Sequence, residues 1–149
     1  MLRKLLKGLI ILLSCWLAVS IVVSFLTPAE KGEPGGLNWD ANECRMLDYQ
    51  TSGDQIRVRY SVRMVNHEED ADLELSFFGL YFTREDVDGW LKYERSYVCT
   101  LESGEASVVI PAGEYVDVVL LFEGEYLRGE VNEDLSAPIN MMFMMSVVD

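Results

Sequence analysis

The sequence predicts an all-β protein, an antiparallel β-sandwich of about seven strands that follows one N-terminal transmembrane helix. Residues 9–26 form an uncharged and almost wholly apolar run, whereas the rest of the chain has ordinary globular composition. In that remainder, short segments alternate apolar and polar residues with a period of two. Turns rich in Gly, Pro and Asp separate these segments, and no amphipathic helix is predicted between them.

The apolar run 9–26 has the length of a membrane-spanning segment. As a helix it would extend roughly 27 Å, close to the thickness of the hydrocarbon core of a bilayer. Arg3, Lys4 and Lys7 precede the run, and all 25 acids follow it. This bias predicts a basic cytoplasmic tail at 1–8, a signal anchor in contact with membrane lipid at 9–26, and an extracytoplasmic remainder.

Two other fates of the N-terminal segment stay open. The stretch 27–29 (TPA) offers small residues at which a signal peptide could be cleaved. The stretch 12–15 (LLSC) resembles the lipobox of bacterial lipoproteins, in which Cys15 would be acylated, although residues 16–26 stay apolar where lipoproteins turn polar. The exported protein is therefore anchored, cleaved or lipidated.

The part of the chain after the apolar run is strongly acidic. It holds nine of the twelve cations and all 25 acids, a net charge of −16. Such a domain repels the phosphates of nucleic acids and anionic lipid headgroups, so nucleic acid is not an expected partner. The same charge keeps a surface soluble and attracts cations or basic partners.

The predicted outer region consists of a linker at 27–43 and a domain at 44–149. The linker begins with the sequence TPAEKGEPGG, which has the composition of an irregular segment. A short strand is predicted at 44–49, followed by a turn at 51–54. The best-defined strand comes next, because its apolar residues alternate strictly with polar ones: Ile56, Val58, Tyr60, Val62 and Met64.

After a charged loop at 66–71, the alternation returns at Leu73, Leu75 and Phe77. The pair Phe77–Phe78 followed by a glycine breaks this alternation and predicts a β-bulge. Residues 83–89 are predicted as a loop. In residues 91–101 the apolar side chains fall on alternate positions, which predicts one bent strand or two short ones.

Three further segments complete the predicted sheet. A strand at 107–110 leads into a turn, in which Pro111 fixes one φ angle and Gly113 permits a positive one. A strand through 116–122 follows. A polar connection at 123–138 comes next, in which a short helical turn is expected. The last strand places five apolar residues on one face, with Met142 and Met144 on the other: Ile139, Met141, Phe143, Met145 and Val147.

Two runs resemble paired strands of a known class of domain. These are 56–66, which ends in YSVRMVN, and 110–124, IPAGEYVDVVLLFEG. They are similar to strands of the small immunoglobulin-like domains of exported, membrane-tethered proteins in Gram-positive bacteria. The resemblance covers most of residues 44–149 and implies an extracytoplasmic immunoglobulin-like β-sandwich. It implies no catalytic residues.

Cys44 and Cys99 are the two cysteines of the outer domain. In an oxidising compartment an even pair can form a disulfide. The alternative is two separate thiols, with Cys99 a small core residue on its strand. The sequence leaves both open, because it does not show whether the two Cα atoms lie within about 7 Å.

Clustered acids raise the hypothesis of a calcium site. The candidate ligands are Asp70, Asp72, Asp86 and Asp88, which lie in two loops, and calcium prefers several carboxylates on a tight turn. The alternative is that these are solvated loop acids. Arg57, Arg59 and Arg63 share the polar face of one strand, where they either bind an anionic partner or pair with Asp72, Glu74 or Asp117 across the sheet.

No motif for catalysis, a metal or a cofactor is found. The chain has one histidine, His67, and no nucleophile lies near it in the sequence. The sequence therefore predicts a membrane-tethered extracytoplasmic domain with a non-catalytic binding or accessory role, whose partner is another envelope protein. The alternative function is ion or ligand sensing through the acidic loops.

Overall fold

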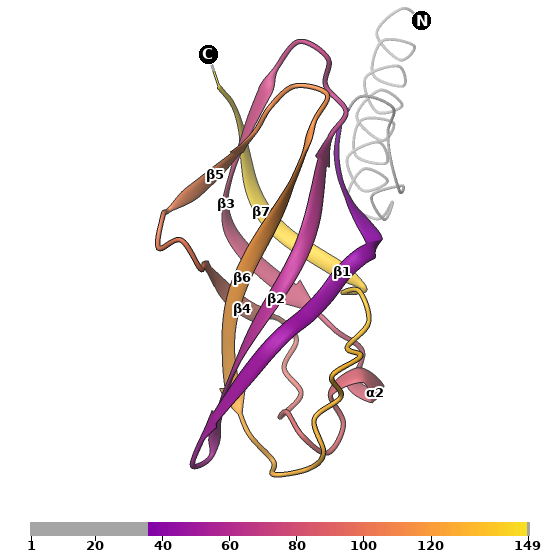
Figure 1. Ribbon diagram of the computed structural model, residues 1–149, viewed down its shortest axis with the longest axis vertical. Coiled ribbons are helices and arrows are strands. Elements are labelled where there is room, and N and C mark those ends of the chain that lie inside the picture. Colours follow the sequence, from indigo (N-terminus) through magenta and orange to yellow (C-terminus); the bar gives the residue numbers. More distant parts are fainter. Residues whose placement is uncertain (1–35, 149) are drawn as a thin grey trace, which may run out of the picture. The chain divides into compact units, whose positions relative to one another are not determined.

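The computed structural model describes residues 36–148 and shows one antiparallel sheet of seven strands (Figure 1). The strands are β1 (Leu37–Ser52), β2 (Gln55–Asn66), β3 (Asp72–Tyr81), β4 (Tyr97–Leu101), β5 (Ser107–Ile110), β6 (Tyr115–Glu125) and β7 (Asn140–Val148). The all-β class and the antiparallel pairing are thus confirmed. The predicted tail 1–8 and anchor 9–26 lie outside the described residues. Within the described range, no helix is long and apolar enough to span a bilayer.

The sheet turns back on itself, so that its two halves face each other. The strand order is β1-β2-β6-β4-β3-β5, and β7 also pairs with β3. Strand β4 connects the halves, because Cys99 pairs with Phe78 of β3 on one side and with Phe122 of β6 on the other. In Figure 1, β3 and β7 lie behind β2 and β6.

The apolar core lies between these halves. Tyr60 of β2 contacts Phe82, just after β3, edge to face, with ring centroids 5.4 Å apart. Phe122 of β6 lies 5.9 Å from Phe82 and 5.2 Å from Tyr97 of β4. These rings therefore join strands from both halves of the sheet, and aromatic pairs at such distances stabilise a core beyond the area they bury.

Strand β2 is the predicted alternating strand. It lies between β1 and β6, and its pairing with β6 runs without a shift of register. Its five predicted core residues are all buried: Ile56, Val58, Tyr60, Val62 and Met64. The period of two appears in the sequence because one face of β2 covers the core along its whole length, although Ser61 on the other face is buried as well.

The predicted bulge in β3 is confirmed. The register with β7 shifts between Ser76 and Gly79, and Phe77 has a φ of 55°. The bulge reverses the expected orientation of the two phenylalanines, because Phe77 is 50 % exposed and Phe78 only 2 % exposed. The alternation had placed Phe77 on the same face as Leu73 and Leu75, and the bulge turns it away from that face.

Strand β1 is much longer than the strand predicted at 44–49. It begins at Leu37, so residues 37–43 of the predicted linker belong to the sheet. Two shifts of register interrupt its pairing with β2, between Asp40 and Arg45 and between Met46 and Asp48. These shifts destroy the alternation from which a strand is recognised in a sequence, which is why the pattern predicted only a fragment of β1.

Three connections also differ in detail. The predicted loop 83–89 contains the one-turn helix α2 (Arg84–Val87). In the region 91–101, β4 covers only its last five residues, and Leu91 forms an isolated bridge with Tyr126. Residues 126–139 contain no helical turn in the described structure. The predicted turn after β5 is confirmed, with Gly113 at a φ of 68°.

Gly129 allows the connection after β6 to pass close to the chain after α2. A Cβ atom at Gly129 would lie 2.0 Å from the carbonyl oxygen of Gly89, which is backbone. A Cβ at Gly124 would instead meet the end of the Leu91 side chain at 2.4 Å, and a side chain can move. We expect Gly129→Ala to lower the free energy of unfolding by about 2–4 kcal/mol and Gly124→Ala by about 1 kcal/mol.

Urea unfolding followed by tryptophan fluorescence measures both glycine variants. Equal losses for the two would contradict the close backbone approach at Gly129.

Candidate functional site

Strand β7 lies at an edge of the sheet. Within residues 36–148 it pairs only with β3, so the backbone groups on its other side face away from the sheet. We call this side of residues 140–148 the free edge of β7. Its sequence, NMMFMMSVV, contains no charged residue and no proline. An edge strand with these properties can pair with another strand.

The side chains of β7 are largely exposed, although most are apolar. The exposed fractions of Met144, Met145 and Val147 are 63 %, 53 % and 58 %. Of the five residues predicted to share one face, only Met141 is buried and Phe143 half-buried, while Ile139 before the strand is exposed. Ile139, Met145 and Val147 are exposed although they share the face of Met141, because no second layer of the described structure covers them. Contiguous exposed apolar side chains commonly mark interaction sites.

The opposite edge of the sheet, β1, is built differently. It carries charged residues at Asp40, Glu43, Arg45 and Asp48, and the two register shifts bend its backbone. Natural proteins use charges and bulges of this kind to prevent strand pairing at an edge. β1 is therefore a protected edge, in contrast to the free edge of β7.

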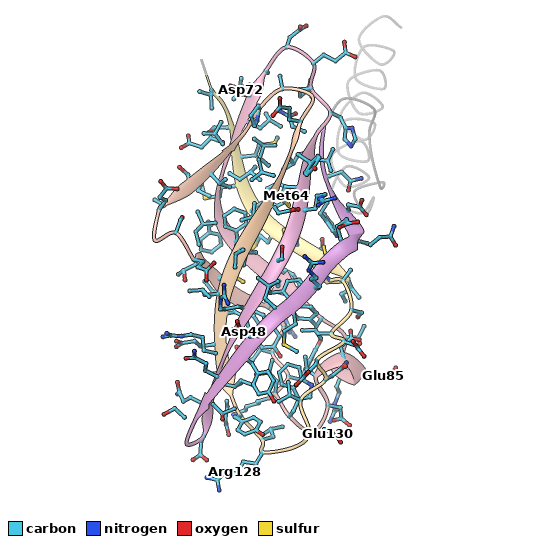
Figure 2. The ribbon with its side chains drawn as sticks, in the orientation of Figure 1. Asp48, Met64, Asp72, Glu85, Arg128 and Glu130 are labelled. Carbon is cyan, nitrogen blue, oxygen red and sulfur yellow. The ribbon has the colours of Figure 1, made fainter. Side chains whose placement is uncertain are left out.

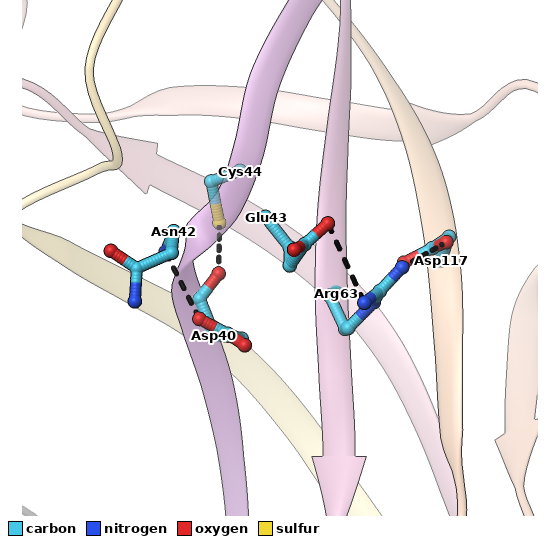
Figure 3. A network of polar contacts seen from close by, with 6 residues as sticks. All are labelled: Asp40, Asn42, Glu43, Cys44, Arg63 and Asp117. Carbon is cyan, nitrogen blue, oxygen red and sulfur yellow. Dashed lines mark hydrogen bonds and ion pairs between the residues drawn. The ribbon is translucent and has the colours of Figure 1, made fainter.

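A polar network fixes the bulged part of β1 (Figure 3). Arg63 of β2 donates to Asp117 of β6 over 2.8 and 2.9 Å, and lies 3.4 Å from Glu43 of β1. Its guanidinium also covers the Tyr115 ring at 4.4 Å. The hydrogen bonds from Arg63 lower the pKa of Asp117 below its usual range. The network ties β1, β2 and β6 together on their solvent face.

The other two arginines of β2 are paired as well. Arg57 lies 2.5 Å from Glu123, and Arg59 binds both Asp48 and Glu102. The predicted pairing of these arginines with acids across the sheet is confirmed, with Asp117 as one of the predicted partners. Asp72 and Glu74 do not pair with these arginines. Asp72 instead accepts from the Ala112 amide and Glu74 from the Ser107 hydroxyl. The arginines are thus engaged within the sheet.

The structure keeps Cys44 and Cys99 as separate, buried thiols. Cys44 lies in β1 and Cys99 in β4, and β2 and β6 lie between these strands. The two cysteines are thus not on neighbouring strands, and neither forms a disulfide in the described structure. The Cys44 thiol donates to the carbonyl oxygen of Asp40, and the Cys99 thiol to that of Tyr97.

Both thiols are expected to resist alkylation in the folded protein. Burial raises the pKa of Cys44 from 9.0 to about 11 and that of Cys99 to about 12, so neither is a thiolate at pH 8. We expect N-ethylmaleimide to add no label to the native Cys15→Ser protein and two labels after denaturation in guanidinium. If the denatured protein accepts label only after reduction, the separation of the two cysteines is contradicted.

The four candidate calcium ligands form two separate pairs. Asp70 and Asp72 lie at the start of β3. Asp86 lies in α2 and Asp88 directly after it, beyond the end of β3, and Figure 2 shows Asp72 and Glu85 of α2 far apart. Asp86 has a structural role, since it accepts from the amide and hydroxyl of Thr83 and from Ser136. Burial alone would raise the pKa of Asp86, but these hydrogen bonds lower it. Among residues 36–148, no three His, Cys, Asp or Glu side chains are grouped to hold a metal ion.

An open groove of about 830 Å³ lies beside the connection that follows β6. Tyr49 and Tyr126 line it together with Glu130, Glu133 and Asp134. Its acids disfavour anionic ligands. In the described structure no buried side-chain polar atom lacks a partner, so none points into this groove toward a ligand. We therefore assign the candidate site to the free edge of β7.

The sequence did not identify this edge as a site. It predicted a strand there with apolar residues on both faces, and only the strand order shows that one side of β7 is unpaired. The absence of charge in residues 140–148 was the available signal.

Comparison with known proteins identifies no relative. No family model, no curated protein and no solved structure matches the chain. Its function is therefore argued from the site itself.

Proposed function

We propose that this protein is a membrane-tethered extracytoplasmic domain with a non-catalytic binding role, which binds a protein of the cell envelope through the free edge of β7. One observation carries the proposal: a nine-residue edge strand without any charge exposes apolar side chains, while the opposite edge is charged and bulged. An edge with these features is suited to the addition of a strand from a partner.

Strand addition would use both the backbone and the side chains of β7. The partner strand would form main-chain hydrogen bonds with the unpaired amides and carbonyls, and its alternate side chains would cover those of β7. Met145 and Val147 lie on the same face as the buried Met141. Covering each of these exposed side chains stabilises a complex by about 1 kcal/mol.

The tether is proposed from the sequence. The cations of 1–8, the apolar run 9–26 and the acids beyond it support an N-terminus in the cytoplasm and a C-terminal domain outside. The immunoglobulin-like sandwich belongs to the same proposal. Its support is the antiparallel all-β fold with two facing halves, which is compatible with that class.

The non-catalytic role rests on how the reactive side chains are used. The two thiols of the described domain are buried and protonated at neutral pH. Asp86 caps α2, and the three arginines of β2 pair with acids. These contacts support structural roles for groups that would otherwise be candidates for chemistry.

The test is co-purification of the full-length chain in detergent. We expect one stoichiometric partner to remain bound to the wild type and to the control Asn42→Lys, which changes the protected edge β1. Met144→Lys should lose that partner, because a lysine on an edge strand opposes pairing. The proposal is wrong if the partner stays bound to Met144→Lys or if the wild type always purifies as a lone monomer.

A further inference from the structure

The sequence around β7 has the same chemistry when it is read in either direction. The nine residues 139–147 are Ile-Asn-Met-Met-Phe-Met-Met-Ser-Val, with Phe143 at the centre. Methionines occupy the first and the second position on both sides of Phe143. The third position is a small polar residue on both sides, Asn140 and Ser146, and the fourth is a β-branched apolar residue, Ile139 and Val147.

This symmetry matches antiparallel pairing of two identical strands. A two-fold axis through Phe143 places residue 142 opposite 144 of the second copy, 141 opposite 145, and 139 opposite 147. Each pair has the same parity, so its two side chains lie on the same face of the joined sheet. Apolar residues thus meet apolar ones and polar residues meet polar ones, which is the self-complementarity that a two-fold interface requires.

Charge also favours this edge for contact between two copies. The chain beyond residue 26 has a net charge of −16, so most surfaces of two copies repel each other. Residues 139–148 contain no acid and no base. Pairing along β7 therefore opposes no like charges within the strands, whereas pairing along β1 would bring charged residues of two copies together.

We infer that the strand bound at the free edge of β7 is β7 of a second copy, paired antiparallel about Phe143. The inference rests on the proposed function, because it names the partner of the same edge. Pairing covers Met145 with Met141 of the second copy and Val147 with Ile139 of the second copy. Each copy thereby covers the exposed Met145 and Val147 side chains of the other.

The lengths of the chain permit this pairing on one membrane. The end of β7 pairs with Asp72, and the start of β1 pairs with Asn66. The Asn66 side chain donates to the carbonyl oxygen of Ala71, next to Asp72. The end of β7 and the start of β1 therefore lie at the same end of the domain. In an antiparallel pair the two β1 starts are therefore separated by roughly 30 Å, the length of β7. Residues 27–36 can span at most about 33–36 Å, so both proposed anchors reach one bilayer.

Cysteine cross-linking of the full-length chain tests the pairing and its register. In a Cys15→Ser background in detergent, Phe143→Cys should form a disulfide-linked dimer on mild oxidation, because residue 143 lies opposite itself. Met142→Cys and Met144→Cys should each cross-link poorly alone and efficiently when mixed, since 142 lies opposite 144. The mixed pair keeps the test valid if Phe143→Cys does not fold.

Sedimentation of the same protein gives the second measurement. We expect a dimer for the wild type and for Asn42→Lys, and a monomer for Met144→Lys. A wild-type monomer, or cross-linking that does not depend on the position of the cysteine, overturns the second copy as the partner. If a different protein is then still lost on Met144→Lys, the proposed function stands; if nothing binds at β7, both fail.

Discussion

Replacing Phe78 with alanine is expected to lower the free energy of unfolding by about 3–5 kcal/mol, whereas replacing its neighbour Phe77 changes it by less than about 0.5 kcal/mol. The two residues have the same side chain and adjacent positions, but Phe78 is buried in the core and Phe77 points outward from the bulge. Removing the buried ring leaves a cavity, and removing the exposed ring leaves none. Equilibrium unfolding in urea measures both variants.

Phe77→Gly provides a further control at the same position. Phe77 adopts a φ of 55°, which L side chains rarely adopt and which glycine adopts readily. We expect this variant to be at least as stable as Phe77→Ala. A large loss of unfolding free energy for Phe77→Ala together with a small one for Phe78→Ala would contradict the bulge and with it the register between β3 and β7.

Asn66→Asp is expected to lower the free energy of unfolding by about 3–5 kcal/mol at pH 7. The Asn66 side chain is buried, and its Nδ2 atom donates to the carbonyl oxygens of Ala71, Ile110 and Pro111 over 2.9, 3.1 and 3.2 Å. A carboxylate has no hydrogen to donate, so it would face three carbonyl oxygens with a buried charge. The measurement is urea unfolding at pH 7 and at pH 4.

The loss should depend on pH with a definite sign. Burial and the three carbonyls favour the protonated form of the new carboxyl, so its pKa in the folded state lies above its unfolded value of about 3.9. A group with a raised folded pKa contributes its stability at low pH and loses it as pH rises. The variant should therefore be closer to the wild type at pH 4. Asn132→Asp, at an exposed position, should show neither effect.

Some strands were predictable because their pattern needs no knowledge of their neighbours. β2 pairs with β6 without a register shift and covers the core on one face, so its alternation alone defined it. β6 was predicted for the same reason, and the turn at Gly113 from the backbone preferences of Pro111 and Gly113. In β1 the same reasoning failed, because extra residues between Asp40 and Arg45 moved later side chains to the other face.

The candidate site depended on information that a pattern does not contain. Alternation in β7 predicted an inward face, but it did not show that the layer opposite ends before Met145 and Val147. The separation of Cys44 from Cys99 likewise follows from the strand order, which the sequence left open. Asp72 and Asp86 are apart because Asp72 begins β3 and Asp86 lies in α2, beyond the end of that strand. The symmetry about Phe143 was present in the sequence, yet it gained meaning only once β7 was placed at an edge.

The most direct test of binding at β7 is photo-cross-linking in intact cells. A benzoylphenylalanine is placed at Met144 on β7 in one protein and at Asn42 on β1 in another, with both chains full-length. We expect irradiation to give one discrete product from position 144, and none from position 42. The same products from both positions, or none from position 144, would contradict the assignment of β7 as the binding edge.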